Sequence, residues 1–374
     1  MADSNNMSDL WKRLRFVLIG IIVYRIGTHI PIPGIDPQRL SSLFDQNQGT
    51  ILELFNLFSG GALERMSIFA LNVVPYISAA IIMQLFSNSI PYLIELKKDG
   101  QAGRNAITQY TRYGTVLLAF IQASALAVTL SSGGLAYNPG TAFFVSAVFS
   151  VVAGTIFLMW LGEQISERGI GNGISIIIAT SILTGIPSAI GQALEQARQG
   201  DLNILMLLSI GVLAMVVIAV VVFIERGQRR ITVNYAQRQQ GRKLMQAQAS
   251  HLPFKVNMAG VIPAIFASTF LLFPASLSTW FGQGENFGFL QSISLALNPG
   301  QPLYVLTFAA LIISFCFIWL ALTFNTREVS DNLKRSGAYI PGIRPGEQTA
   351  GYIDNVLARL TVYGSMYLTF ICLL

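Results

Sequence analysis

Few residue patterns in this sequence could support covalent chemistry. His29 and His251 lie in different elements, far apart in the sequence, and do not form a metal-ligand pattern. Gly169–Gly173 has the glycines of a phosphate loop, but no strand precedes it and no Lys-Ser/Thr pair follows it. We interpret it as a tight turn before a membrane span. We find no HExxH motif, no Walker A motif and no nucleophile–base pair in the apolar stretches. We therefore predict no enzyme activity, no cofactor and no metal.

The composition predicts an integral membrane protein. Of the 374 residues, 53% are hydrophobic and only 11% are charged, whereas soluble domains carry about 25% charged residues. Too few polar groups are present to cover a soluble fold of this size, so most of the surface should face lipid. Cys316 and Cys372 lie in apolar runs without CxxC spacing, and we expect them to pack as small hydrophobic side chains.

The apolar stretches are long enough for membrane helices, which need about 20 residues to cross a bilayer. We predict spans at residues 16–33, 68–87, 114–132, 142–162, 173–190, 203–224, 259–278 and 303–324. A ninth span begins near residue 360 and reaches the end of the sequence. Because that span would end within the hydrocarbon, we expect the sequence to be part of a longer chain.

The basic residues predict the orientation in the membrane. Only three of the 24 Lys and Arg residues fall on the side opposite the N-terminus, namely Arg39, Arg65 and Arg198. Arg25 lies inside the first span, and the others share the side of the N-terminus. Cytoplasmic loops are rich in Lys and Arg, so we predict a cytoplasmic N-terminus. For Arg25 an inward-facing structural role is favoured over snorkelling along the helix to the interface.

A half-apolar segment before the second span has two interpretations. Phe55–Arg65 is too short to cross the membrane and contains the pair Gly60-Gly61. It is either a short helix that re-enters the membrane, which requires protein or a water-filled cavity around it, or an amphipathic helix at the surface. The pattern alone favours neither.

The loop at residues 225–258 is more basic than topology requires. It carries seven Lys and Arg residues, which suggests an anionic partner, either lipid head groups or structured RNA. Attraction to the membrane surface alone remains an alternative. Ile231–Tyr235 alternates like a strand, so a hairpin is plausible in this loop. A second long loop at residues 325–359 is predicted on the same side.

The spans themselves favour a passive pore over an ion-coupled carrier. Secondary carriers place carboxylates or histidines within their spans, and these spans hold almost none. The second and seventh spans instead carry polar and helix-bending residues. These residues either help two helices to separate or stabilise ordinary packing between membrane helices. They are Asn72, Pro75, Ser78 and Gln84 in the second span, and Pro263, Ser268 and Pro274 in the seventh.

Several longer segments resemble the SecY family, the channel subunit of the bacterial secretion translocon. They include Ile30–Gly34, Phe58–Ala62, Gln109–Gly114, Gly162–Ile165, Glu167–Ser175, Val256–Pro263 and Gly342–Thr349, in the family's order along nearly the whole chain. The resemblance implies an all-α membrane bundle of two pseudo-symmetric inverted halves with ten spans, of which about nine are present here. The halves would be residues 1–193 and 203–374, joined by a hinge loop at 194–202.

The resemblance also implies a pore closed by a ring of aliphatic side chains. At the matching positions these are Val73, Ile77, Ile174, Ile178 and Ile265, and a further member would lie in the absent tenth span. Residues 73 and 77, and likewise 174 and 178, are spaced to share one helix face. An apolar constriction expels water and blocks ions. Val73 stands where isoleucine is more usual in the family.

The resemblance assigns three further sites. The plug, near residues 56–66, would sit against the ring; its matching residues are Phe58, Ser59, Gly60, Gly61, Ala62, Leu63, Glu64 and Arg65. The lateral gate would be formed by the second and seventh spans, with Ser78, Gln84, Asn257 and Ser268. Cytoplasmic partners would dock on Arg229, Arg230, Arg238, Arg242, Lys243 and Arg344.

The implied function is a gated channel that passes unfolded polypeptides across the bacterial cytoplasmic membrane and releases hydrophobic segments sideways into the bilayer. The implied partners are the SecE and SecG subunits, the motor ATPase SecA, the ribosome, signal-sequence-bearing polypeptides and membrane lipids. The channel would be a multi-pass protein of the inner membrane.

Overall fold

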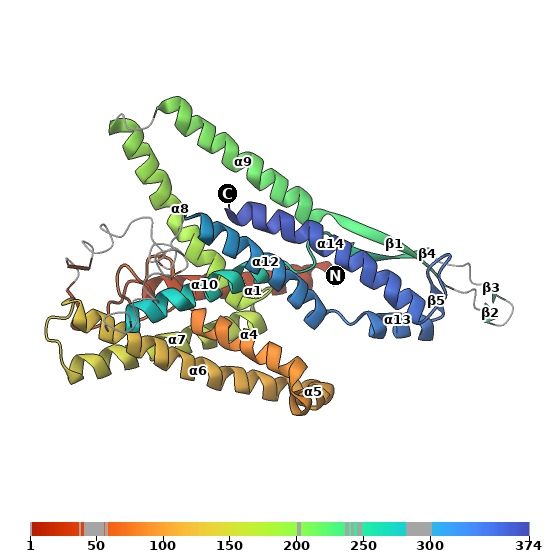
Figure 1. The fold of residues 1–374 in the computed structure, drawn as a ribbon, viewed down its shortest axis with the longest axis horizontal. Coiled ribbons are helices and arrows are strands. Elements are labelled where there is room, and N and C mark those ends of the chain that lie inside the picture. Colours follow the sequence, from red (N-terminus) through yellow and green to blue (C-terminus); the bar gives the residue numbers. More distant parts are fainter. Residues whose placement is uncertain are drawn as a thin grey trace. The chain divides into compact units, whose positions relative to one another are not determined.

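The computed structural model is mostly helical (Figure 1). It describes residues 2–36, 39–40, 56, 59–199, 203–235, 239–240, 243–244, 249–281 and 301–373. The chain divides into two compact units, Met1–Leu202 with Leu272–Gln301, and Asn203–Leu271 with Pro302–Leu374.

The first unit is a bundle of antiparallel helices. Its elements are α1 (Ala2–Gly27), α4 (Val74–Ser89), α5 (Pro91–Lys98), α6 (Gly100–Ser132), α7 (Thr141–Arg168) and α8 (Gly173–Gln199). Helix α6 packs against α4 and α7, and α7 also contacts α1 and α8. The predicted hinge loop therefore begins inside a helix, because α8 continues to Gln199.

The second predicted span differs from the structure at both ends. Helix α4 begins at Val74 rather than at residue 68, with Pro75 in its first turn, where the missing proline N–H is not needed. At its other end the chain bends by 93° into α5, and Pro91 starts that helix. Residues 88–113, between the second and third predicted spans, are thus largely helical.

Helix α6 is longer than a bilayer is thick. Its 33 residues rise to about 50 Å at 1.5 Å per residue, against a hydrocarbon core of about 30 Å. The first turns of α6, which contain Arg104 and Arg112, therefore project from the membrane as a continuous helix.

Two glycines let the turn before α4 pack closely between α1 and α7. A Cβ atom added at Gly27 would overlap the ring of Phe69, and one at Gly154 would overlap the backbone carbonyl of Ile68. Any side chain at either position would push residues 68–69 away from these helices.

The second unit combines apolar helices with a small antiparallel sheet. Its elements are α9 (Ile204–Arg226), β1 (Gln228–Tyr235), β2 (Gln239–Gln240), β3 (Lys243–Leu244), β4 (Ala249–Lys255), α10 (Ile262–Phe281, which begins in this unit), α12 (Pro302–Thr323), α13 (Thr326–Arg335), β5 (Ala338–Tyr339) and α14 (Glu347–Leu373).

The sheet confirms the hairpin predicted in the basic loop. Strand β1 pairs with β4 from Gln228↔Lys255 to Asn234↔Ala249, and β5 joins the other edge of β1. Ile231 and Val233 alternate toward a buried cluster that includes Ile353 and Leu357 of α14. The alternation in sequence therefore marks one buried face of the strand.

Among the described residues, six helices are long and apolar enough to cross a membrane, or seven if the bent pair α4–α5 is one span. The six are α6, α7, α8, α9, α12 (extended to Arg335) and α14. The predicted spans at 16–33 and 259–278 fall on α1 and α10. Helix α1 carries four basic residues near its apolar part, and the described apolar stretch of α10 is the short Ile262–Leu271.

Candidate pore, plug and docking sites

Four of the five predicted ring residues lie in one apolar cluster of the first unit. Val73 is buried in it with Tyr24 and Ala62, and Ile77, Ile174 and Ile178 pack against it. The backbone N–H of Ile77 donates to the Val73 carbonyl at 3.0 Å, so the two residues share a helix face although Val73 precedes α4. Ile265, on α10, is half-buried in the second unit.

The described part of the predicted plug is buried inside the first unit. Ser59, Gly60, Ala62 and Leu63 are buried, whereas Glu64 and Arg65 are exposed. Residues 60–66 form successive turns. Phe58 lies outside the described residues. Burial of this kind is expected of a re-entrant segment and not of an amphipathic helix at a surface.

Gly60 of this segment lies tightly against α8. It has φ +67°, and a Cβ atom there would lie 3.0 Å from Thr184 Oγ1 and 3.1 Å from Ser181 Cα. A side chain at this position would be strained by its backbone conformation and crowded by the helix.

Side chains of α1 and the turn after it hold the segment through hydrogen bonds. The Tyr24 hydroxyl donates to the Ser59 carbonyl at 3.1 Å, and Arg25 Nη1 donates to the Gly60 carbonyl at 3.2 Å. Arg65 Nη1 lies 3.1 Å from His29 Nε2. Half-buried Arg25 thus points inward to the protein, which confirms the predicted structural role.

The chain beyond α1 continues this attachment through its backbone. The N–H of Ile32 donates to the Met66 carbonyl at 2.8 Å, and the N–H of Ile68 donates to the Ile30 carbonyl at 3.0 Å. The segment is therefore held along its length, and not only at Tyr24.

The predicted gate residues have individual structural roles. Asn257 is buried, and its Nδ2 donates to Glu225 Oε1 at 2.9 Å, while its Oδ1 accepts from the Gly260 N–H at 3.1 Å. This amide fastens the turn before α10 to the end of α9. Ser268 Oγ donates to the Ile265 carbonyl within α10. Ser78 and Gln84 are half-buried on α4.

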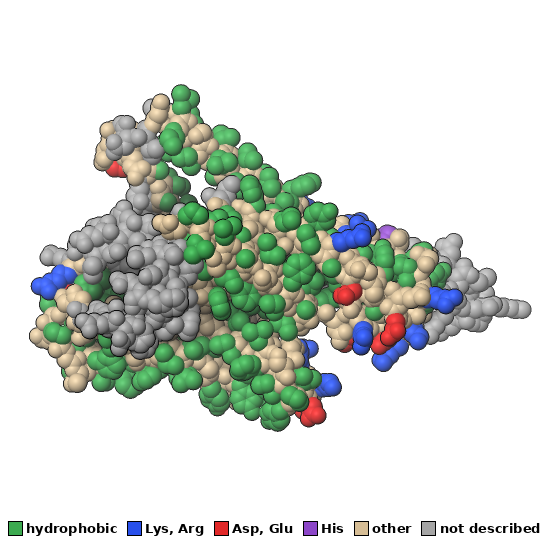
Figure 2. Space-filling model, viewed as in Figure 1, with side chains coloured by type: hydrophobic (Ala, Val, Ile, Leu, Met, Phe, Trp, Pro, Cys, Tyr) green, Lys and Arg blue, Asp and Glu red, His purple; other side chains and the backbone are tan. Residues whose placement is uncertain are grey.

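The predicted docking residues are exposed where the structure describes them. Arg229 and Arg230 lie on β1, and Arg344 lies between β5 and α14. Figure 2 shows Lys and Arg side chains, with some acidic ones, gathered at the end of the second unit that holds β1, β4, β5 and α13. Arg238 and Arg242 lie outside the described residues, and Lys243 is on β3.

The backbone around Arg344 is fixed although its side chain is exposed. Thr349 Oγ1 donates to the Arg344 carbonyl at 2.8 Å, and Ser330 Oγ donates to the Gly346 carbonyl at 2.7 Å. Gly342 and Gly346 have φ +82° and +111°, which glycine adopts readily. The loop therefore presents the guanidinium from a defined position.

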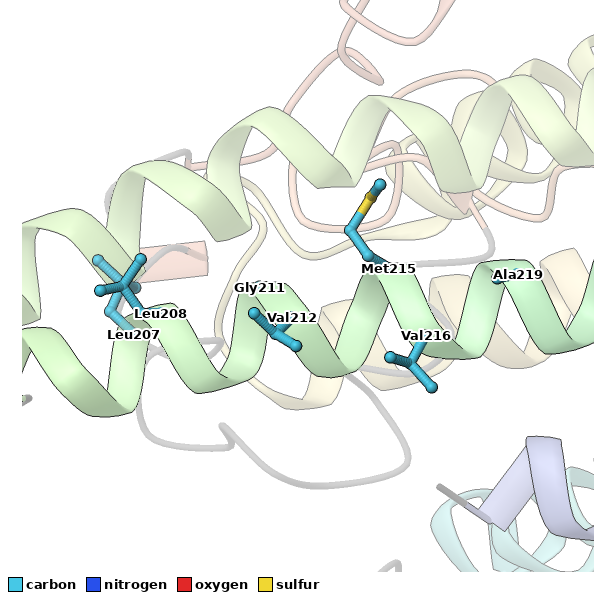
Figure 3. Close-up of a pocket in the computed structure, with 7 residues that line it drawn as sticks. All are labelled: Leu207, Leu208, Gly211, Val212, Met215, Val216 and Ala219. Carbon is cyan, nitrogen blue, oxygen red and sulfur yellow. The ribbon is translucent and has the colours of Figure 1, made fainter.

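Among the described residues we find no cluster of side chains suited to metal binding or to orienting a polar substrate. The described residues contain no group of three or more His, Cys, Asp or Glu residues that could hold a metal. A concave surface along α9 is lined by apolar residues of that one helix (Figure 3). They are Leu207, Leu208, Gly211, Val212, Met215, Val216 and Ala219. None of these side chains carries a hydrogen-bonding group suited to orienting a polar substrate.

Comparison with known proteins places this arrangement in a family. The SecY family model matches residues 67–374. The chain belongs to the SecY family. It is 62% identical over 372 residues to the protein translocase subunit SecY of Pseudomonas aeruginosa, covering all of this chain and 84% of that protein. It is 60% identical over 377 residues to SecY of Escherichia coli K12, covering all of this chain and 85% of that protein.

The fold of this chain is similar to the folds of solved channel structures. One, titled "The structure of a protein conducting channel", matches with a TM-score of 0.67 at 18% identity, over 97% of this chain and 85% of that one. The channel in the complex titled "Sec61 in the Canine ribosome-channel complex from the endoplasmic reticulum" matches with a TM-score of 0.62 at 15% identity, over 96% and 84% of the two chains.

These comparisons confirm the predicted family and the multi-pass helical fold. SecY proteins are translocase subunits and channels, not catalysts of covalent chemistry, as we predicted for this chain. Sequence reasoning missed Tyr24 and Ser181 beside the predicted plug segment, and the ion pair of Arg112 with Glu163. Their only signal in the sequence was a polar residue within or beside an apolar stretch.

Proposed function

We propose that this chain is a gated channel that conducts unfolded polypeptides across the cytoplasmic membrane and releases hydrophobic segments sideways into the bilayer. Membership in the SecY family supports the protein-conducting function. The structural observation that carries the proposal is the burial of Ser59, Gly60, Ala62 and Leu63, with Ala62 in the same apolar cluster as Val73, Ile77, Ile174 and Ile178.

In the resting channel, the aliphatic ring and the plug seal the pore together. An apolar constriction disfavours water and ions, and Ala62 of the plug is buried in the same cluster as Val73. Ile265 of the second unit is the fifth ring member in this proposal. When the plug leaves, the ring side chains remain as the flexible contact around a passing polypeptide.

The lateral gate in this proposal comprises α4 and α10. Ser78 and Gln84 contribute from α4, Ser268 contributes from α10, and Asn257 fixes the turn from which α10 starts. Pro75 and Pro263 stand near the starts of these helices, where they limit backbone bonding to the preceding turns.

Cytoplasmic partners bind the basic sheet and the Arg344 loop in this proposal. These cytoplasmic partners are the ribosome, which binds through ribosomal RNA, and the motor ATPase SecA. SecE and SecG are the other membrane subunits of the channel in this proposal. Energy comes from translation or from the ATP-driven partner. The distribution of Lys and Arg supports a cytoplasmic N-terminus in the bacterial inner membrane.

Crosslinking to a stalled polypeptide tests the proposal. A photo-crosslinker at Ile178, in membranes that hold a stalled secretory polypeptide, should react with sites along that polypeptide. The same probe at Leu183 is the control, because this residue is 60% exposed and its spacing of five residues from Ile178 places it on another face of α8. If the Ile178 probe reacts only with lipid or neighbouring helices, the pore assignment is wrong.

A further inference from the structure

Three buried polar side chains meet behind the plug, each from a different element. Tyr24 on α1 is 1% exposed, Asn72 before α4 is 2% exposed and Ser181 on α8 is fully buried. The Tyr24 hydroxyl lies 2.6 Å from Ser181 Oγ, and Asn72 Nδ2 donates to the same Ser181 oxygen at 3.0 Å. Tyr24 also reaches the plug at the Ser59 carbonyl.

Counting protons on the hydroxyls gives the cluster two arrangements. Tyr24 and Ser181 each have one proton to donate. In the first arrangement, Ser181 donates to Tyr24, and Tyr24 donates to the Ser59 carbonyl. In the second, Tyr24 donates to Ser181, and Ser181 donates to the Ile177 carbonyl of its own helix, 2.9 Å away. Only the first arrangement bonds the hydroxyl to the plug.

The first arrangement is a continuous chain of donors from Asn72 through Ser181 and Tyr24 to Ser59. Hydrogen bonds in such a chain polarise and strengthen one another in a low-dielectric interior. Asn72 is held in position for it with φ +48°, a left-handed conformation that asparagine tolerates better than most residues. The ring of Tyr24 stacks on Phe69, with centroids 6.1 Å apart, which fixes the direction of its hydroxyl.

We propose that Tyr24, Ser181 and Asn72 form a latch that holds the plug in its seat and so sets how often the resting channel opens. This inference rests on the proposed function of residues 59–66 as the plug. Tyr24 is the positioning residue, because its hydroxyl is the member of the latch that contacts the plug. Ser181 and Asn72 act through it.

The latch also links plug movement to water. When the plug is seated, the Tyr24 hydroxyl is bonded and excluded from solvent. When the plug leaves, the Tyr24 hydroxyl can turn to Ser181, as in the second arrangement. The Ser59 carbonyl loses its donor and needs a new one, because a buried polar group without a partner is strongly disfavoured. Water that enters an opening pore supplies this donor, so the latch resists opening most while the pore is dry.

Hydrogen exchange of the plug tests the latch directly. In the full-length protein in lipid nanodiscs, Tyr24→Phe removes the hydroxyl and keeps the stacked ring, and Ser181→Ala removes the next link. Tyr24→Phe should speed amide exchange in peptides covering residues 59–68 by about 2- to 10-fold, the range expected for one lost net hydrogen bond. Ser181→Ala keeps the Tyr24 bond to the Ser59 carbonyl but removes the donor that polarises it, so it should speed this exchange by a smaller factor. Tyr113→Phe and Ser175→Ala are matched controls at exposed positions of α6 and α8 and should leave this exchange unchanged.

The double variant tests whether the bonds act as one chain. With Tyr24→Phe and Ser181→Ala together, exchange should be close to that of the faster single variant, because either change already breaks the chain. Effects that multiply fully would show independent contacts and overturn the latch. Unchanged exchange in Tyr24→Phe would overturn it as well.

Ion leak through the reconstituted channel separates failure of the latch from failure of the plug assignment. Gly60→Val should unseat the plug while the three latch side chains are unchanged, because it places a β-branched side chain at φ +67° against Thr184 and the backbone of Ser181. A leak in Gly60→Val without faster exchange in Tyr24→Phe refutes the latch and leaves the plug. Faster exchange in Tyr24→Phe without leak in either variant refutes the plug and with it the gating role of the latch.

Discussion

Arg112 of α6 and Glu163 of α7 form a two-pronged ion pair. Arg112 Nε donates to Glu163 Oε1 and Nη2 donates to Oε2, both at 2.8 Å. The Glu163 carboxylate is therefore matched by an arginine of the neighbouring helix, and residues 112 and 163, far apart in the sequence, lie side by side in the first unit.

Breaking this pair should loosen the junction of α6 and α7. Arg112→Lys replaces the planar guanidinium by a single ammonium group. The variant should lose most of the interaction energy that depends on the two parallel hydrogen bonds. Because Arg112 is 44% exposed and Glu163 18% exposed, we expect a coupling of only about 0.5–1 kcal/mol. A double-mutant cycle with Glu163→Gln, read by thermal unfolding, measures it. The more exposed Arg13–Asp9 pair is the control and should give less; equal couplings would contradict the prediction.

Polar replacement in the ring should raise ion leak. Ile77→Asn and Ile178→Asn place an amide in the apolar constriction, which then retains water and passes ions. Conductance of the reconstituted full-length channel at rest is the measurement. Ile178→Leu keeps the apolar volume and should remain sealed. Conductance unchanged by both asparagines would remove these residues from the seal.

Charge reversal at Arg344 should reduce secretion while the protein stays in the membrane. Its side chain is exposed on a loop fixed by Thr349 and Ser330, so Arg344→Glu alters the presented charge with little effect on folding. Secretion of a reporter, with the amount of channel in membranes quantified in parallel, checks this. Arg198→Glu changes a residue predicted on the opposite side and should secrete normally. Normal secretion in both variants would show that Arg344 is not a docking residue.

Neutralising the basic hairpin should weaken ribosome binding. Arg238→Gln, Arg242→Gln and Lys243→Gln each remove one cation that would neutralise phosphate. Each should lower affinity and reduce the slope of log affinity against log salt by about 1 or less. Binding titrations at several salt concentrations measure both, with Arg198→Gln as the control. An affinity independent of salt would argue against an RNA-like partner.

The sequence was most informative where one signal extended over many residues. Apolar length located most of the spans, and alternation at Ile231–Tyr235 located the hairpin, because both reflect a repeated environment along an element. Strand β5, with two residues, is too short to show any period. The start of α4 was also missed, because Ile68–Leu71 is as apolar as a helix while Asn72 turns the chain by a positive φ.

Single contacts between distant residues were beyond the sequence. Nothing distinguishes Ser181 from Ser175 as a serine of α8, yet one is fully buried against Tyr24 and the other is exposed. The ring positions likewise look like any other aliphatic side chains until the family or the shared cluster sets them apart. Such residues are defined by what lies opposite them in space.

The two bonds from α1 to the plug both end on backbone carbonyls, those of Ser59 and Gly60. Every amino acid supplies such a carbonyl, so these contacts depend on the path of the plug backbone and not on the identity of its side chains. Substitutions along the plug that keep this path can accumulate without loss of these two bonds. The chemical requirement falls on the other partner, because the side chains at positions 24 and 25 carry the donors of these two bonds.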